Sequence, residues 1–200
     1  MHHRFRGLTA VVTGAGRGLG LGCARALALE GAEVVLVSRT QPELDTAVAA
    51  IQQAGGQARA FACDVTDPVA VIKLFDGLTR CDVLINNAGG NTPQPFLDVD
   101  VATLDRLLTL NVRSMFLVAQ AAARVMARTG GGAIVHMSSQ MGHVGGPQRS
   151  VYCMTKHAIE GLTKAMAIDL APLGIRVNAV APTYIETPMT KPFLEDEQQR

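Results

Sequence analysis

The sequence predicts an α/β fold in one domain: a doubly wound parallel sheet with helices on both of its faces. Three observations carry this prediction. Short apolar runs alternate with longer stretches of helical apolar spacing, a glycine-rich turn follows the first run, and polar residues follow several later runs. Strands that alternate with helices pair in parallel, because each crossover needs a covering helix that brings the chain back to the same end of the sheet.

The composition excludes several classes of protein. Two hundred residues, 48% of them hydrophobic, suffice for a single full core. The formal net charge of +1 offers no basic stripe for nucleic acid, and the sequence shows neither a membrane-spanning run nor a leader-like segment, so we expect a cytoplasmic protein without nucleic-acid or membrane partners. The four cysteines, at positions 23, 63, 81 and 153, form no Cys-x-x-Cys pair, which argues against a metal site.

The first strand is predicted over residues 8–13, and a helical stretch over 21–30 follows the turn Gly14-Ala-Gly-Arg-Gly-Leu-Gly20. A strand, a glycine turn and a helix form an arrangement that binds phosphate. Glycines let the backbone approach a pyrophosphate, and the amides and dipole at the start of the helix favour its charge. The alternative is a plain tight turn, which needs one or two glycines, whereas this turn has four in seven residues.

The second strand is predicted over residues 33–37, and its end is where a dinucleotide enzyme reads the ribose. Ser38 and Arg39 stand there. An acid at this position accepts from the 2′-hydroxyl of NAD, whereas an arginine pairs with the 2′-phosphate of NADP. Arg39, together with Arg17 from the glycine turn, therefore favours NADP, with NAD possible. The alternative is that Arg39 is a solvated loop residue.

The next four elements continue the alternation: a helix over 41–54, a strand over 58–63, a helix over 69–78 and a strand over 82–85. Asp64 and Val65 end the third strand, where the carboxylate can approach an adenine amino group. Asn86 and Asn87 end the fourth strand. Their amides can bond the backbone of a neighbouring strand or a nucleotide ribose, and the sequence leaves both roles open.

A long helix is predicted over residues 101–128, with a broad apolar face that suits packing both on the sheet and on a partner subunit. We therefore expect a homodimer or homotetramer that forms through the long helices. Asn111 lies inside this apolar face. An asparagine in a buried helix usually satisfies a local backbone group, and this one can also hold a water beside a lysine.

The chemistry is predicted near the end of the fifth strand, residues 133–137, which Ser138 and Ser139 follow. A helix over 152–170 and a sixth strand over 175–180 come next. Tyr152 and Lys156 are four residues apart and so share one face of this helix. An ammonium beside a phenol favours the phenolate, which helps the tyrosine exchange protons. Taken alone, the pair is weak evidence, and a packed tyrosine beside a solvated lysine is the better interpretation of it.

Together these motifs resemble the short-chain dehydrogenase/reductase family, whose sheet is Rossmann-like. The residues that carry the resemblance occur in order: Thr13-Gly-x-x-x-Gly-x-Gly20, Asp64-Val65, Asn86-Asn-Ala-Gly89, Asn111, Ser139, Tyr152-x-x-x-Lys156, and Pro182 with Ile185 and Thr187. The resemblance implies hydride transfer at a nicotinamide. It also implies that Tyr152 is the general acid and base, that Ser139 bonds the substrate oxygen, that Lys156 lowers the tyrosine pKa and binds the ribose, and that Asn111 anchors a relay water.

The predicted cofactor-binding set is Gly14, Arg17, Gly18, Leu19, Gly20, Ser38, Arg39, Asp64, Val65, Asn87, Tyr152, Lys156, Pro182, Ile185 and Thr187. The predicted substrate contacts are Ser139, Gln140 and Tyr152, around a small carbonyl or alcohol. Within the family, the resemblance is to 3-oxoacyl thioester reductases and to sugar or polyol dehydrogenases. His143 is interpreted as a polar pocket or loop residue, because the tyrosine already fills the acid–base role.

The chain departs from the family pattern in two places. Pro182-Thr183 stands where the family commonly has Pro-Gly, and the last family strand is missing after Arg200. We therefore expect residues 1–200 to be a C-terminally truncated short-chain oxidoreductase domain. The alternative function is an inactive nucleotide-binding scaffold, or a fragment that lacks the tail that covers the substrate.

Overall fold

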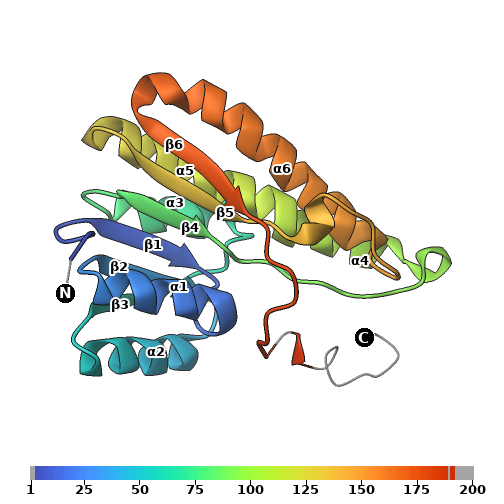
Figure 1. Cartoon of the computed structure of the whole chain (residues 1–200), viewed down its shortest axis with the longest axis horizontal. Coiled ribbons are helices and arrows are strands. Elements are labelled where there is room, and N and C mark those ends of the chain that lie inside the picture. The colour runs from blue at the N-terminus through green and yellow to red at the C-terminus, as the bar shows by residue number, and fades with distance from the viewer. Residues whose placement is uncertain (1–2, 189, 192–200) are drawn as a thin grey trace.

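The strands form one parallel sheet in the order β3-β2-β1-β4-β5-β6 (Figure 1). The structure, a computed structural model, describes residues 3–188 and 190–191. The strand bounds are β1 Thr9–Thr13, β2 Glu33–Ser38, β3 Gln57–Ala62, β4 Val83–Asn86, β5 Gly132–Met137 and β6 Ile175–Val180. The strand order reverses between β1 and β4, and ligands of doubly wound sheets bind at the carboxyl ends of the strands at such a point. The predicted fold class is confirmed.

Helices cover both faces of the sheet (Figure 1). The helix bounds are α1 Gly18–Leu29, α2 Gln41–Gln53, α3 Pro68–Asp76, α4 Val101–Leu108, α5 Ser114–Thr129 and α6 Ser150–Leu170. Alternate residues of β1 point to opposite faces. Val12 packs in the apolar core under α1 and α2, whereas Val11 packs in the core shared with α3, α5 and α6. Strands buried on both faces explain why the strand sequences are nearly continuous apolar runs.

The long helix predicted over 101–128 is present, but it contains a π-helical turn that the prediction did not include. A π-helical turn, Thr109–Arg113, separates α4 from α5 and contains the fully buried Asn111. The side chain of Asn111 bonds both backbone groups of Gly90, which lies outside the helix. A π turn adds one residue to a helical turn and is frequent at functional sites. Apolar spacing does not reveal it, because the helix continues in the same direction on both sides.

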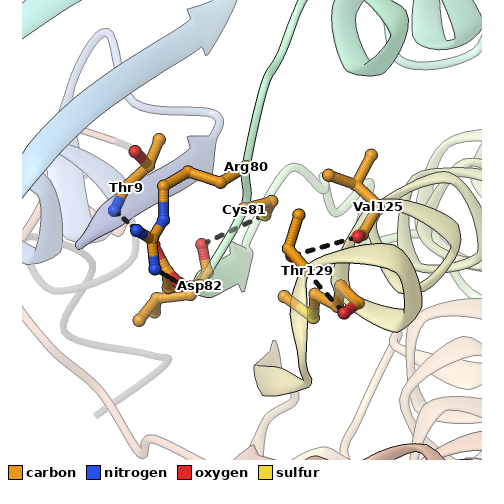
Figure 2. Close-up of polar contacts among 8 residues, drawn as sticks. Thr9, Arg80, Cys81, Asp82, Val125 and Thr129 are labelled. Carbon is orange, nitrogen blue, oxygen red and sulfur yellow. Dashed lines mark hydrogen bonds and ion pairs between the residues drawn. The ribbon is translucent and has the colours of Figure 1, made fainter.

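The end of the sheet opposite the carboxyl edge is fastened by Asp82 (Figure 2). Arg80 donates two hydrogen bonds to its carboxylate, at 2.6 and 2.8 Å, and the backbone amide of Thr9 donates a third at 2.7 Å. Asp82 therefore joins the start of β1 to the start of β4. Its contacts fix how far the two central strands extend past one another, and so help to align their carboxyl ends.

Candidate active site

A cavity of about 320 Å³ lies at the carboxyl edge of the sheet. Nearly the whole predicted cofactor set lines it: Gly14, Arg17, Gly18, Leu19, Ser38, Arg39, Asp64, Val65, Asn87, Tyr152, Lys156, Pro182, Ile185 and Thr187. Ser139 lines it as well, whereas Gly20, Asn111 and Gln140 do not. The structure thus brings the glycine turn, the ribose-reading strand end and the Ser-Tyr-Lys group around one cavity.

The glycine turn is built from residues that need freedom at φ. Gly14 and Gly18 have φ of +64° and +59°, a region that other residues rarely adopt. Helix α1 begins at Gly18, three residues earlier than predicted, so that Gly18, Leu19 and Gly20 form its first turn. The backbone amides of a first turn have no partner within the helix, and those at this cavity can therefore donate to an anion.

Gly20 serves the turn through packing, and its replacement is testable. A Cβ at Gly20 would overlap the carbonyl oxygen of Gly14 and lie 2.6 Å from Nδ2 of Asn87. We expect Gly20→Ala to lower the melting temperature and to weaken NADPH binding roughly 10-fold or more, because α1 must move away from the turn. Gly22→Ala is the matched control in the same helix, since nothing lies within 4 Å of its Cβ. Equal melting temperatures and equal nucleotide affinities for the two variants would contradict this account.

The side-chain amides of Asn86 and Asn87 both bond backbone, which answers a question that the sequence left open. Asn86 is buried and donates to the carbonyl oxygen of Met115 at 2.7 Å, so it holds α5 against the sheet. Asn87 donates to the carbonyl oxygens of Thr13 and Gly14, at 2.9 and 3.3 Å, and it also lines the cavity. Asn87 therefore positions the glycine turn, and a contact to the ribose stays a prediction.

Thr13 connects these groups. Its hydroxyl donates to Oδ1 of Asn86 at 3.4 Å and accepts from the backbone amides of Asn87 and Ala88, at 2.9 and 3.0 Å. The side chain is fully buried. One threonine thus fastens the ends of β1 and β4 where the strand order reverses.

The ribose-reading end of the cavity contains an acid that the sequence analysis missed. Arg17, Ser38 and Arg39 line it as predicted, and Glu43 from the first turn of α2 lines it too. Oε2 of Glu43 would lie 2.8 Å from a Cβ at Gly16, so the carboxylate reaches back to the glycine turn. The available signal was an acid in the first turn of the helix after the ribose-reading strand, which is also a common helix-capping preference.

Asp64 uses much of its hydrogen-bonding capacity locally. Its Oδ1 accepts from the backbone amide and the hydroxyl of Thr66, at 2.9 and 2.8 Å. Burial alone would raise the pKa of Asp64, but the two Thr66 bonds and the charge of Arg39 outweigh it, so the pKa falls below its usual value. Asp64 is therefore a carboxylate at neutral pH, with Oδ2 left for a contact to adenine, which remains a prediction.

The predicted catalytic pair lies on α6 with the expected geometry. Nζ of Lys156 is 5.6 Å from the centroid of the Tyr152 ring and donates to the carbonyl oxygen of Met137 at 2.7 Å. Lys156 is only 4% exposed, which excludes the solvated lysine of the alternative interpretation. Ser139, at the end of β5, is buried, and its hydroxyl accepts from the backbone amide of Met141 at 3.2 Å.

In the chain by itself the net shift of the Tyr152 pKa is upward, and the expected lowering of this pKa by Lys156 stays a prediction. Burial raises the pKa of the Tyr152 phenol above its usual value, and the opposing effects of the Ser139 hydroxyl and the Arg149 charge are smaller. Burial also lowers the pKa of Lys156 to about 8, against the opposing charge of Glu160. The physical reason is that burial disfavours the charged forms of both groups, the phenolate of Tyr152 and the ammonium of Lys156.

Asn111 lies behind the cavity and connects two of its walls. Its Oδ1 accepts from the amide of Gly90, and its Nδ2 donates to the carbonyl oxygen of Gly90, both at 2.8 Å. Nδ2 also donates to the hydroxyl of Thr155 at 3.1 Å, one residue before Lys156. Both amide hydrogens are therefore used by the protein. The role of Asn111 as a water anchor stays a prediction. Such a water would have to donate a hydrogen bond to an oxygen atom of Asn111, because both amide hydrogens already have partners.

The loops on the substrate side surround Ser139. Gln140 donates its backbone amide to the carbonyl oxygen of Pro182 at 3.0 Å, which joins the short 3₁₀ helix Gln140–Gly142 to the loop after β6. Thr183 of that loop lines the cavity, although it replaces the family glycine. His143 contacts Glu160, with Nε2 and Oε1 3.4 Å apart. That contact fits a loop histidine.

Among residues 3–188 and 190–191, no helix is long and apolar enough to cross a membrane. No group of three or more His, Cys, Asp or Glu side chains is placed to hold a metal ion in that part of the chain.

This fold and this cavity define a nucleotide-dependent oxidoreductase. The family model described as short chain dehydrogenase matches residues 8–198. The chain belongs to the short-chain dehydrogenase/reductase family, whose members act on alcohol and carbonyl groups with NAD(P).

Named relatives agree with this assignment. L-xylulose reductase from Bos taurus is 42% identical over 200 residues, which are 100% of this chain and 80% of that protein. Carbonyl reductase [NADPH] 2 from Sus scrofa is 40% identical over 199 residues, 99% of this chain and 80% of that protein. The crystal structure of a gluconate 5-dehydrogenase from Burkholderia cenocepacia J2315, in complex with NADP and tartrate, superposes with a TM-score of 0.94 at 33% identity and covers 99% of this chain and 79% of that one.

Proposed function

We propose that the chain is an NADP-dependent oxidoreductase that transfers hydride between a nicotinamide and a ketone or secondary alcohol, with Asn111, Ser139, Tyr152 and Lys156 as its site. The observation that carries the proposal is the single cavity that joins Arg39 and the glycine turn to Ser139, Tyr152 and Lys156. The test is oxidation of NADPH in the presence of ketones. Tight NADPH binding without turnover would favour the inactive scaffold instead.

The chain's own residues supply the proton chemistry, and a bound nicotinamide supplies or accepts the hydride. In carbonyl reduction the Ser139 hydroxyl donates a hydrogen bond to the substrate oxygen. The Tyr152 phenol then gives its proton to that oxygen as the hydride reaches the carbon. Tyr152 leaves this step as a phenolate, which Ser139 and the Lys156 ammonium stabilise until a proton returns. Alcohol oxidation runs the same steps backward and so starts from the phenolate.

The choice between NADP and NAD depends on the end of the cavity that would bind the adenosine ribose. The guanidinium groups of Arg17 and Arg39 and the hydroxyl of Ser38 line that end and suit a 2′-phosphate. Carbonyl reductase [NADPH] 2 and the gluconate 5-dehydrogenase solved with NADP support the same choice. Glu43 works against NADP, because its carboxylate would repel the 2′-phosphate.

Replacing Arg39 by Asp is expected to weaken NADPH binding about 10- to 100-fold, the range for loss of a charge-assisted hydrogen bond. NADH binding should be unchanged or tighter, because the new acid accepts from the ribose hydroxyl. Fluorescence titration with both nucleotides measures the ratio. Arg25→Asp, an exposed position on α1 that does not line the cavity, is the charge-matched control. An unchanged NADPH/NADH ratio in Arg39→Asp would show that another group reads the ribose.

The substrate class proposed for this site is a polyhydroxylated ketone or alcohol of the sugar or polyol type. The names of relatives, L-xylulose reductase and gluconate 5-dehydrogenase, support it over the 3-oxoacyl thioesters that the resemblance also allowed. The hydroxyl groups of Ser139 and Tyr152, which both line the cavity, suit a substrate with several hydroxyl groups. A panel of keto-sugars, 3-oxoacyl thioesters and aryl ketones discriminates between the classes.

Assembly and location complete the proposal. We propose a homodimer or homotetramer that forms through the long helices. Phe116 on α5 and Met154 and Ile168 on α6 are large apolar side chains that are 46%, 45% and 76% exposed. Burial of such side chains favours association. Light scattering of the purified chain gives the subunit number, and fractionation of expressing cells tests the predicted cytoplasmic location.

A further inference from the structure

Glu160 lies one helical turn beyond Lys156 on α6, on the same side of the helix. Its side chain is 14% exposed, and its Oε1 is buried and has no hydrogen-bond partner among the described residues. Nε2 of His143, from the loop after Ser139, lies 3.4 Å from that oxygen. An acid in such a position is costly unless something compensates its charge.

The close packing around this acid depends on Gly142. A Cβ at Gly142 would lie 2.9 Å from the hydroxyl oxygen of Ser138, 3.1 Å from Cγ of Glu160 and 3.1 Å from the carbonyl oxygen of Lys156. The glycine therefore lets the loop that carries Ser139 and His143 rest directly on the turn of α6 that holds Lys156. The Ser138 hydroxyl is buried there and has no hydrogen-bond partner among the described residues.

The charged neighbours of Lys156 are few. Burial lowers its pKa to about 8, and Glu160 is the group whose charge works against this shift. Tyr152 on α6 and His136 on β5 are the other titratable groups near it. Burial, followed by the charge of Lys156, lowers the pKa of His136 to about 4, so this imidazole is neutral at physiological pH.

The charged side chains of α4 and β6, two elements that pack against α6, are Asp105, Arg106 and Arg176, and these form no ion pair with Lys156 or Glu160. The π turn presents the neutral Asn111, through its bond to Thr155. Among residues 3–188 and 190–191, no ion pair joins Glu160 to α4 or β6. Around Glu160 itself, Nε2 of His143 lies 3.4 Å from Oε1, and the Ser138 hydroxyl and Cγ of Glu160 approach the same side of Gly142.

We propose that Glu160, positioned by His143 and by the close approach at Gly142, is a positioning residue of the reaction: its carboxylate keeps the proton on Lys156. The inference deepens the proposed function and rests on it, since Lys156 is the group that would bind the ribose and stabilise the Tyr152 phenolate. Glu160 does not line the cavity, so it acts through the lysine alone. The loop that borders the substrate thereby also influences the charge of the catalytic helix.

Glu160→Gln tests the proposal, because it keeps the size of the side chain and removes its charge. The first measurement is the NADPH dissociation constant from pH 6.5 to 9.5. The pH at which binding weakens should fall by about one unit, so that the variant binds roughly 10-fold more weakly at pH 9 and nearly normally at pH 6.5. Asp169→Asn, which removes an exposed charge from the same helix, is the matched control and should leave the profile unchanged.

The second measurement needs no cofactor. Urea unfolding of parent and variant at pH 7 and pH 10 should show the variant less stable at pH 7, with the deficit shrinking at pH 10, where Lys156 has lost its proton in both. A deficit that is the same at both pH values means that Glu160 only packs, and it overturns the inference.

The two measurements also separate the two proposals. A parent that fails to bind NADPH refutes the proposed function, whereas a parent that binds, with an identical pH profile in Glu160→Gln, refutes the role of Glu160 alone.

Discussion

Tyr152→Phe is expected to lower turnover by roughly 10² to 10⁴, the range for loss of a general acid, while NADPH still binds. Phenylalanine keeps the ring and most of its packing and removes the hydroxyl that would protonate the carbonyl oxygen. Nucleotide affinity should survive, because the glycine turn and Lys156 remain in place. Steady-state kinetics and fluorescence titration of the same preparation separate the two effects.

The pH dependence of the parent enzyme gives an independent check on Tyr152. Because burial raises the pKa of Tyr152, the phenol keeps its proton at neutral pH and is ready to donate it. Ketone reduction should therefore be fast near neutral pH, and alcohol oxidation, which starts from the phenolate, should accelerate as the pH rises. A Tyr152→Phe variant with parental turnover would refute the mechanism and leave this residue a packing role.

Lys156→Met is expected to abolish turnover and to weaken NADPH binding at least about 10-fold, because one ammonium serves both the tyrosine and the ribose. The same change should leave the cofactor-free fold at least as stable as the parent at pH 7. The shift of the Lys156 pKa from 10.5 to about 8 corresponds to a cost of about 3 kcal/mol. Loss of the bond to the Met137 carbonyl offsets part of this gain, about 1 to 3 kcal/mol.

The stability of the parent relative to Lys156→Met should depend on pH, because burial lowers the pKa of Lys156. The pKa of Lys156 is lower in the folded than in the unfolded chain, so the penalty is fully present below pH 8 and is relieved as the pH rises toward 10.5. The parent should therefore gain stability relative to Lys156→Met between these values, as urea unfolding at pH 7 and pH 10 would measure. Lys164→Met, at an exposed lysine on the same helix, is the control and should show no such trend. If the difference in free energy of unfolding between the parent and Lys156→Met is the same at pH 7 and pH 10, burial of the Lys156 charge does not destabilise the fold.

The sequence was most informative where a physical rule leaves few choices. The sixth strand, Ile175–Val180, was predicted with its observed bounds, because alternating apolar and polar residues between Gly174 and Pro182 are typical of a strand. Most residues of the predicted cofactor set line one cavity, since parallel strands bring their carboxyl ends to one edge of the sheet. Gly20 does not line that cavity and packs against Gly14, so a contact of Gly20 to the cofactor stays a prediction.

Features that depend on contacts between distant segments were not accessible from the sequence. The π turn at Asn111 arises from its bonds to Gly90, which lies 21 residues earlier. The raised pKa of Tyr152 depends on how completely the surrounding loops bury it, and a spacing of four residues to Lys156 says nothing about burial. Glu43 enters the cavity because α2 lies against the glycine turn, a tertiary arrangement that its helical position does not reveal.

The connection of Thr13 to Asn86 and Asn87 has a consequence for biosynthesis. The glycine turn is among the first segments to leave the ribosome, but the amide that bonds Thr13 and Gly14 follows 74 and 73 residues later. At synthesis rates of about 5 to 20 residues per second, the nascent turn waits several seconds for its support. During that interval β1 can pair with β2 but not with β4. The glycine turn therefore gains its support only once β4 has emerged.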